Sequence, residues 1–529
     1  MKKITVILFM AAFAFSSCKK QLNINQNPNQ PTSVTPDVVL AAALVGTAGD
    51  NAVDYLGLTR WMGFWSRSGN YVPDVQTETY NIANDYTDGE WGNIYVNLNN
   101  YDYIEKVGHA QNLPFYVGVA KVMKAYGFGT LVDIYSDVPY SDCFKPATDI
   151  KPTYDKGPDI YNDLLVQLDS AAQYFEDAKA FYSIQPASVA ATDDQHDIMF
   201  GSARTGAKKY SDRLDLWVKF VNTVELRLLM HLSQVGAMQS IIQSKLMALS
   251  TAPVTHLDSL RASVSGGPGF IGANESAAVN PGYQASGGKI SPLYGVFYKV
   301  DGTTTVNYDY YRANSYAVNF YLNTGDERQA FLYAGTSISP GSNFDGDPAS
   351  VPNTNTAGVG AGLLKGFNQD QFIFSDFESL FLQAEAVQRG YIVGDAQSLY
   401  ESAVIQNYIY LVVPSFSNIV PDPVGDAQFY LSQGVVDADW AATPDKLELI
   451  LTQKWAAMNG VNWVEAYTDY RRTGFPNTTW LDISHSPSHV QPQIPVRYLY
   501  PQSEYNTNGS NVPQLGANAQ FTAKVFWNQ

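Results

Sequence analysis

Cysteine is scarce in this sequence, which has only two in 529 residues, Cys18 and Cys143. Cys18 lies at the end of an N-terminal stretch with the pattern of a secretion signal, so Cys143 has no partner in the remaining chain. These numbers exclude an internal disulfide framework and a metal site built from several cysteines. The body of the protein must therefore be stabilised by packing.

Positive charge is also scarce, because 33 lysines and arginines face 50 aspartates and glutamates, which gives a net charge of -17. Removal of Lys2 and Lys3 with a signal peptide changes this value to -19. Such a balance argues against nucleic acid as a partner and against docking by charge on an anionic surface. After Phe15 the sequence also lacks any run of the roughly 18 apolar residues that a membrane-spanning helix needs.

The N-terminus has the pattern of a lipoprotein signal. Two lysines precede an apolar run, Ile4 to Phe15, that is too short to span a bilayer of ~30 Å as a stable anchor. The letters FSSC, which end at Cys18, resemble a bacterial lipoprotein box, although an unmodified cysteine beside an ordinary cleavage site is the alternative. We expect a signal peptide over residues 1–17, lipidation of Cys18, and a flexible tether rich in Asn, Gln and Pro over residues 18–36.

Aromatic residues are abundant, since the 35 tyrosines outnumber the lysines and arginines together and 9 tryptophans are added to them. Many of these rings must reach the surface. An exposed ring beside Asn, Gln or Thr offers a flat apolar face with hydrogen-bond partners nearby, and this combination suits a pyranose ring.

Apolar residues recur at three- and four-residue steps over long stretches, which predicts amphipathic helices. Two of these stripes are Ile160, Leu164, Leu165, Leu168, Ala172 and Phe175, and Leu214, Trp217, Val221, Val224, Leu228 and Leu232. Helix pairs with small residues where they cross favour tetratricopeptide-like hairpins, although the sequence shows no strict repeat period.

A further helix carries signals at both of its ends. Ser375 and Glu378 predict a capping box, and Gly390 can adopt the left-handed conformation that ends a helix. We expect a second helix after Asp395 and a third that begins at Thr443, with proline in its first turn.

Two stretches break the helical pattern. Residues 251–370 are rich in Gly, Ser, Asn, Thr and Pro, with aromatic islands such as YGVFYKV and NYDYYR, and the tail after Arg472 is irregular. Loops of this kind often carry binding surfaces.

The predicted fold is therefore mainly α. A single domain over residues 37–529 is expected to combine a tetratricopeptide-like helical hairpin scaffold, at about 37–250 and 371–471, with long irregular loop insertions and an irregular C-terminal tail.

Several segments together resemble the SusD/RagB family of nutrient-binding outer-membrane lipoproteins of Bacteroidetes, in particular its second SusD-like branch. The segments that carry this resemblance are Cys18 with the following NQNPN, GVAKVMKAYGFGTLVDIYSDVPYSDCF, WVKFVNTVELRLLMHLS, FESLFLQAEAVQRG with DAQSLYESAV, LTQKWAAMNGVNWVEAYTDYRRTGFP, and RYLYPQSEYNTN. They cover most of the chain in the expected order.

The resemblance implies a helical scaffold that docks a SusC-like TonB-dependent outer-membrane transporter, with irregular insertions that bind glycan. It implies a lipoprotein anchored in the cell outer membrane and facing outward, which captures oligosaccharide and delivers it to the transporter. Lys19 and Lys20 follow the cysteine where acidic export signals are common in such lipoproteins, so the outward orientation is implied by the family alone.

Candidate ligand-binding residues are aromatics outside the helical stripes, with polar neighbours. The first group lies in WMGFWSRSGNYVPDVQTETY and consists of Trp65, Arg67, Asn70, Tyr71 and Tyr80. The second group lies in the insertion and consists of Tyr294, Phe297, Tyr308 and Tyr310. We expect the two groups to converge.

Enzyme and cofactor signatures are incomplete, so we expect no catalytic residues, no cofactor and no metal. GYQASGGKIS lacks the first glycine and the Ser or Thr of a phosphate loop, and GVGAGLLKG lacks the third glycine of a dinucleotide fingerprint. Proline between His485 and His489 prevents the two from sharing a helical face.

The leading hypothesis is noncatalytic capture of oligosaccharide. Capture of peptide or another nutrient by the same route is the alternative. A surface-anchored glycosidase would need a carboxylate pair in a cleft with one raised pKa, and a pure assembly protein would need no ligand at all.

Overall fold

The structure is a computed structural model that describes residues 34–52, 57–145, 150–207, 209–251, 253–334, 356–412, 422–477 and 493–528. The predicted signal peptide, the lipidation site Cys18, the tether up to residue 33, and His485 with His489 lie outside these described residues. None of the helices in the described ranges is both long and apolar enough to cross a membrane.

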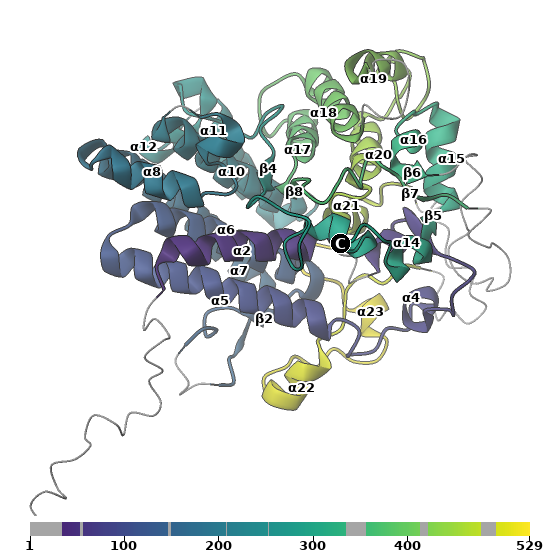
Figure 1. The fold of residues 1–529 in the computed structure, drawn as a ribbon, viewed down its shortest axis with the longest axis horizontal. Coiled ribbons are helices and arrows are strands. Elements are labelled where there is room, and N and C mark those ends of the chain that lie inside the picture. The colour runs from purple at the N-terminus through teal and green to yellow at the C-terminus, as the bar shows by residue number, and fades with distance from the viewer. Residues whose placement is uncertain are drawn as a thin grey trace, which may run out of the picture.

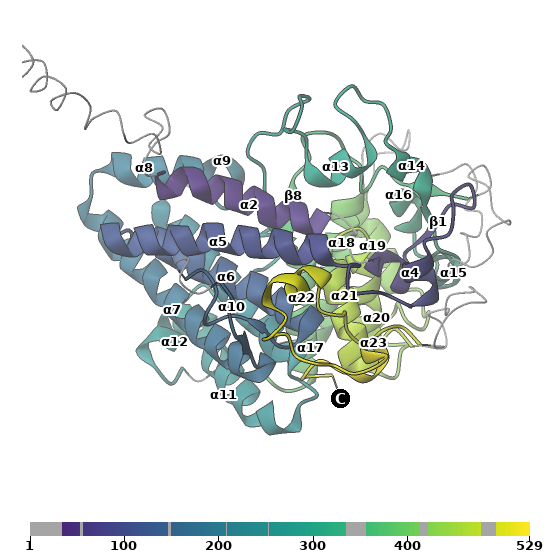
Figure 2. The same ribbon diagram turned by 90° about the horizontal axis from the view of Figure 1, so that it is seen from below.

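Long helices form the N-terminal half of the scaffold (Figures 1 and 2): α2 (Pro36–Ala52), α5 (Asp88–Gln111), α6 (Pro114–Tyr135), α7 (Gly157–Ile184) and α10 (Tyr210–His231). α6 packs against both α5 and α7 and is buried along most of its length. Its glycines permit this packing, because a Cβ on Gly118 would lie 3.2 Å from the Phe175 ring and one on Gly129 would lie 3.0 Å from Leu228.

The C-terminal half of the scaffold consists of α17 (Asp376–Gln388), α18 (Ala396–Leu411), α20 (Lys446–Met458) and α21 (Trp463–Thr473). α17 and α18 form a hairpin, and α20 packs against both. The amphipathic spacing in these segments therefore predicted their helices correctly, as did the helical pattern in the first half.

The ends of these helices agree only in part with the sequence prediction. Ser375 accepts a hydrogen bond from the Glu378 N–H at 3.2 Å, and Gly390 has φ +75°. The Glu378 carboxylate does not complete the capping box, because it pairs with Arg227 and accepts a hydrogen bond from Asn462. α20 begins after Thr443, since Asp445 accepts hydrogen bonds from two N–H groups of its first turn.

The stretch from 251 to 370 contains short elements between its loops. In its described part these are α12 (His256–Arg261), η2 (Ser263–Ser265), β4 (Ala277–Val279), α13 (Pro292–Phe297), α14 (Val306–Tyr310), β5 (Tyr311–Ala313), α15 (Ser315–Thr324), α16 (Gln329–Leu332), β6 (Tyr333–Ala334) and β7 (Gly358–Val359).

Short strands connect distant parts of the chain as antiparallel pairs. β1 (Trp65–Arg67) pairs with β5, β2 (Val138–Pro139) with β3 (Tyr154–Asp155), β4 with β8 (Gln371–Phe374), and β6 with β7. The remaining elements are α3 (Leu58–Trp61), α4 (Val75–Thr79), α8 (Ala187–His196), α9 (Ser202–Thr205), η1 (Gly236–Met238), α11 (Gln239–Ser250), α19 (Pro423–Leu431), α22 (Gln502–Asn508) and α23 (Ala519–Thr522).

One hydrophobic cluster extends through both halves of the scaffold, and buried ions cross it. His231 on α10 lies 3.2 Å from Asp133 on α6 and 3.1 Å from Glu465 on α21. Lys454 on α20 pairs with Glu465 and lies 2.9 Å from Asp469. The two halves are thus joined by charged groups as well as by apolar packing.

Candidate functional site

The β1–β5 pair brings the two predicted groups of site residues together. Trp65 lies opposite Ala313 and Arg67 opposite Tyr311, so the segment around residue 65 runs beside the insertion. Beyond the strands, the Tyr71 ring meets the Tyr310 ring edge to face, with centroids 5.4 Å apart. Figures 1 and 2 both place α4 and α14 at the same end of the molecule as this pair.

A series of tyrosine rings continues from this contact through the insertion. Tyr310 meets Tyr311 at 5.2 Å between centroids, and Tyr298 meets Tyr308 at 5.3 Å. Tyr294 and Tyr298 are stacked, with centroids 4.7 Å apart and ring planes 13° apart. These residues are half-buried and form what we call the tyrosine surface: Tyr71, Tyr294, Tyr298, Tyr308, Tyr310 and Tyr311.

Local sequence explains how α13 and α14 present these rings. Pro292 is in the first turn of α13, and Tyr294 and Tyr298 are one turn apart at its end. Thr305 caps α14 by accepting from the Asn307 N–H, and its hydroxyl donates to the Val296 carbonyl at 2.6 Å. The cap therefore fastens α14 to α13.

Two buried arginines donate hydrogen bonds to residues of the tyrosine surface. Arg60 donates to the Tyr310 hydroxyl at 3.0 Å and to Asp74 at 2.8 Å. Arg312 donates to the carbonyls of Tyr308 and Asp309 at 3.2 and 3.1 Å. Hydrogen bonds to backbone and side chains fix both guanidinium groups, and these groups in turn fix the positions of Tyr308 and Tyr310.

Two titratable groups in this region have shifted pKa values. Burial opposes ionisation of Asp74, but the Arg60 guanidinium and hydrogen bonds from Arg60 and Thr77 outweigh it and keep the pKa of this carboxyl below its usual range. Partial burial, with the hydroxyl of Tyr308, raises the pKa of Tyr298 to about 12. Asp74 is therefore an ionised carboxylate and not a proton donor at neutral pH.

Several predicted site residues are buried. Trp65 is 3% exposed, and its indole N–H donates to Asn459 at 3.1 Å. Arg67 is 3% exposed and donates to Glu78 at 2.5 Å and to the Tyr71 carbonyl at 2.6 Å. Tyr80 is fully buried and packs on the edge of Trp61. Other protein groups surround these side chains. Many of those groups lie far away in the sequence, so sequence spacing does not reveal them.

The other predicted residues differ in exposure. Phe297 is 8% exposed and packs on Tyr311, whereas Tyr71, Tyr294, Tyr308 and Tyr310 are half-buried. Asn70 is exposed on the loop between β1 and α4. Sequence reasoning missed Tyr298 and Tyr311, although both lie in the aromatic islands of the insertion and share their pattern.

Trp65 and Phe297 also line a small cavity of about 30 Å³, together with Leu293, Tyr311 and Trp463. A pocket for a drug-sized ligand has about 300–1,000 Å³. This cavity is too small for a sugar ring.

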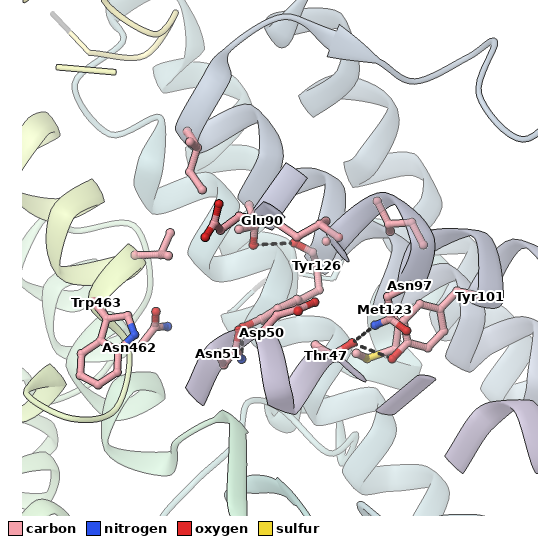
Figure 3. Close-up of a pocket in the computed structure, with 16 residues that line it drawn as sticks. Thr47, Asp50, Asn51, Glu90, Asn97, Tyr101, Met123, Tyr126, Asn462 and Trp463 are labelled. Carbon is pink, nitrogen blue, oxygen red and sulfur yellow. Dashed lines mark hydrogen bonds between the residues drawn. The ribbon is translucent and has the colours of Figure 1, made fainter. Parts of the chain in front are cut away.

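A second cavity, of about 70 Å³, lies where α2, α5 and α6 meet the start of α21 (Figure 3). Asp50, Asn51, Glu90 and Asn97 contribute polar groups, and Trp463 closes one end. Burial and the neighbouring Glu90 carboxylate raise the pKa of Asp50 to about 7. No residue of this cavity was predicted from sequence, because its polar groups come from separate helices with no local motif.

Across the described part of the chain, no cluster of three or more His, Cys, Asp and Glu residues has the arrangement of a metal site. Two arginines at the end of α21 are part of the scaffold. Arg471 donates to the Asp133 carbonyl at 2.7 Å, and Arg472 pairs with Glu385.

Comparisons with solved structures show the same fold over nearly the whole chain. A SusD/RagB family protein from Bacteroides thetaiotaomicron matches with a TM-score of 0.67 and 19% identity, covering 94% of this chain and 99% of the other. A chitin-binding SusD homologue from Flavobacterium johnsoniae matches with a TM-score of 0.68 and 18% identity, over 93% and 98%. A chitin-binding protein matches with a TM-score of 0.67 and 23% identity, over 94% and 100%.

Sequence comparison agrees with the structural likeness. A search of curated protein sequences gave no match. The model of one family, SusD-like_2, described as "Starch-binding associating with outer membrane", matches residues 28–501. The chain therefore belongs to the SusD-like family of starch-binding, outer-membrane-associated proteins, as its sequence segments predicted.

Proposed function

We propose that this protein is a noncatalytic, lipid-anchored receptor that captures oligosaccharide outside the cell and delivers it to a SusC-like TonB-dependent transporter. The observation that carries the proposal is the tyrosine surface, in which half-buried rings from two distant segments stand side by side on buried arginines. Stacked and tilted tyrosines offer apolar faces to the C–H side of a sugar, and their hydroxyls can bond its rim.

Family membership supports a glycan as cargo. The family description names starch, and two of the similar structures are named as chitin-binding, so both neutral and acetamido glycans belong in the test. An open surface of a few rings should bind with a Kd between ~1 mM and ~1 µM. Such affinity permits transfer to a transporter.

The charge environment favours binding over hydrolysis. A glycosidase acid needs a raised pKa, whereas Asp74, beside the tyrosine surface, has a lowered one. Asp50 has a raised pKa but lines a cavity of about 70 Å³, which is too small to admit a glycosidic bond between two sugar rings.

The test is calorimetric titration with maltooligosaccharides, chitin oligosaccharides, acidic oligosaccharides and peptides. The Tyr294→Ala/Tyr298→Ala double variant removes the half-buried ring stack, and Tyr174→Ala removes a half-buried tyrosine from α7 as a matched control. We expect binding of at least one glycan to weaken about tenfold or more in the double variant and to stay unchanged in the control.

Recovered sugars should remain uncleaved, and the protein should co-purify with its transporter when the two are co-expressed. Cleaved sugar would establish an enzyme instead. Binding of peptides alone would favour the alternative cargo, and a lack of any ligand with retained transporter binding would favour a pure assembly role.

A further inference from the structure

The cavity between α2, α5, α6 and α21 has an unusual combination of walls and charges (Figure 3). Its walls are mainly apolar and include Leu98, Met123 and the ring of Trp463. Two carboxylates, Asp50 on α2 and Glu90 on α5, are placed among them. Neither lysine nor arginine is among the residues that line it.

Asp50 has no counter-ion within the described residues. No hydrogen bond or ion pair to its carboxylate is found there, and its charged neighbour is Glu90, which repels it. The other titratable groups that face it are the tyrosines Tyr101 of α5 and Tyr126 of α6, while α21 contributes Asn462, Trp463 and Val464. Arg227 lies over the Tyr126 ring, 4.5 Å from its centroid, and is not a lining residue.

Trp463 provides an independent sign that the cavity is built for a ligand. Its side chain belongs to a residue only 8% exposed, yet the indole N–H has no hydrogen-bond partner among the described residues. In Figure 3 this nitrogen lies on the side of the ring that faces Asp50 and Asn51. A buried hydrogen-bond donor without a partner lowers the free energy of unfolding. Such donors are therefore rare in folded proteins unless a ligand or a water accepts their hydrogen bond.

We propose that this cavity binds a small amino alcohol, whose ammonium head pairs with Asp50 and whose hydroxyl oxygen accepts a hydrogen bond from the Trp463 N–H. The ammonium would neutralise Asp50, which is partly buried and repelled by the Glu90 carboxylate. A bare ammonium has only N–H donors and offers no acceptor to the indole N–H, whereas the hydroxyl oxygen of an amino alcohol does. A volume of about 70 Å³ exceeds the roughly 10–15 Å³ that one water needs, which leaves room for an ammonium with a short body.

The same features argue against a metal ion. Calcium takes six to eight oxygen ligands and magnesium keeps a polar octahedron, whereas most of this lining is carbon. Trp463 also lines the small cavity beside Tyr311, but none of the lining residues of the amine site belongs to the tyrosine surface, so amine binding can be tested apart from glycan binding.

The test is calorimetric titration of the whole protein with methylammonium, ethanolamine and choline chlorides, with calcium chloride and potassium chloride as comparison ions. Asp50→Asn removes one charge and keeps the shape of the side chain. Asp85→Asn, at an exposed position in a turn before α5, is the matched control. Trp463→Phe removes the N–H donor and keeps a ring, and urea midpoints show whether each variant is folded.

We expect one saturable site for ethanolamine or choline, and weaker binding of methylammonium, which has no acceptor for the indole N–H. Asp50→Asn should weaken binding about tenfold or more, and Asp85→Asn should leave it unchanged. Affinity should be higher at pH 8 than at pH 6, because Asp50 must lose its proton to pair with the cation. Trp463→Phe should weaken binding while its urea midpoint stays close to that of the parent.

Several outcomes would overturn the proposal. They are a lack of saturable binding by both ethanolamine and choline, equal binding by Asp50→Asn and the parent, and tighter binding of calcium or methylammonium than of ethanolamine or choline. A crystal structure with the cavity filled only by water in saturating amine would overturn it as well.

Discussion

Arg472 and Glu385 form a bidentate ion pair in which Nη1 lies 2.7 Å from Oε1 and Nη2 lies 2.6 Å from Oε2. The pair joins α21 to α17, and both side chains are fully buried. Burial opposes ionisation of Glu385, but Arg472 and Arg389 outweigh it and lower its pKa to about 2. Charge, and not only apolar contact, therefore fixes these two helices to each other.

Glu385→Gln should destabilise the protein by about 3–5 kcal/mol, because Arg472 is then left buried with a weaker partner. Urea unfolding followed by circular dichroism measures this change. Glu327→Gln, at an exposed position before α16, is the control and should change stability by less than about 0.5 kcal/mol. Equal effects of the two variants would contradict the role given to the pair.

Stability should fall between pH 6.5 and 9 through His231. Burial disfavours the imidazolium, but Asp133 and Glu465 outweigh it and raise the pKa of His231 from 6.5 to about 9. The folded state then keeps a proton that the unfolded chain releases above pH 6.5, so the stabilisation is complete below 6.5 and is lost as pH rises through about 9. The loss should be roughly 3 kcal/mol.

Urea midpoints at closely spaced pH values between 6 and 10 check this expectation, with His231→Gln beside the parent. The variant should be less stable at pH 6 and should show a flatter decline than the parent. Parallel curves for the two proteins would show that His231 does not hold its proton as described.

The ion pair between Arg67 and Glu78 should stabilise the loop between β1 and α4, and this effect should need both residues. Arg67→Ala and Glu78→Ala should each cost about 3–5 kcal/mol, since each leaves a buried partner without its counter-charge. The double variant should cost much less than the sum, which a double-mutant cycle of urea unfolding measures. An additive cycle would mean that the two residues do not act together.

Trp65→Ala should lower stability by about 3–5 kcal/mol, because the indole fills the core and donates to Asn459. Tyr294→Ala should cost less than about 1.5 kcal/mol, because the half-buried ring loses little packing. Thermal unfolding of the two variants separates their roles. A larger effect for Tyr294 than for Trp65 would reverse the assignment of core and surface.

Cys143 should resist alkylation in the folded protein. Burial raises the pKa of its thiol to about 12, and the S–H donates to the Tyr140 carbonyl at 2.8 Å. At pH 8 iodoacetamide should therefore modify it slowly in buffer and quickly in urea, which mass spectrometry of the peptide around Cys143 measures. Fast labelling in buffer would show that the thiol is more exposed than described.

Helices were the part of the fold that the sequence predicted well. The stripe from Ile160 and all but the last residue of the stripe from Leu214 lie in observed helices, and the end signals Ser375 and Gly390 flank α17, because such spacing and capping act over one or two turns. Glu378 was assigned wrongly to a capping box, since its partners Arg227 and Asn462 are far away in the chain. Local rules cannot include such partners.

Candidate site residues show the same limit. The sequence distinguished aromatics inside helical stripes from those outside, and this led to Tyr71 and Tyr310, whose rings meet in the structure. It could not distinguish the buried Trp65 from the half-buried Tyr71, because Asn459 and Tyr333, which pack around Trp65, lie hundreds of residues away.

The sequence by itself determined the family, the helical class and the segments that carry aromatic rings, because composition, periodicity and ordered motifs are properties of neighbouring residues. Only the tertiary structure decided which rings form one surface and which fill the core. It also decided that Asp50 and Glu90 share a cavity with the unpaired indole N–H of Trp463. Burial and charge depend on side chains brought together from distant helices, and the packing of those helices sets both.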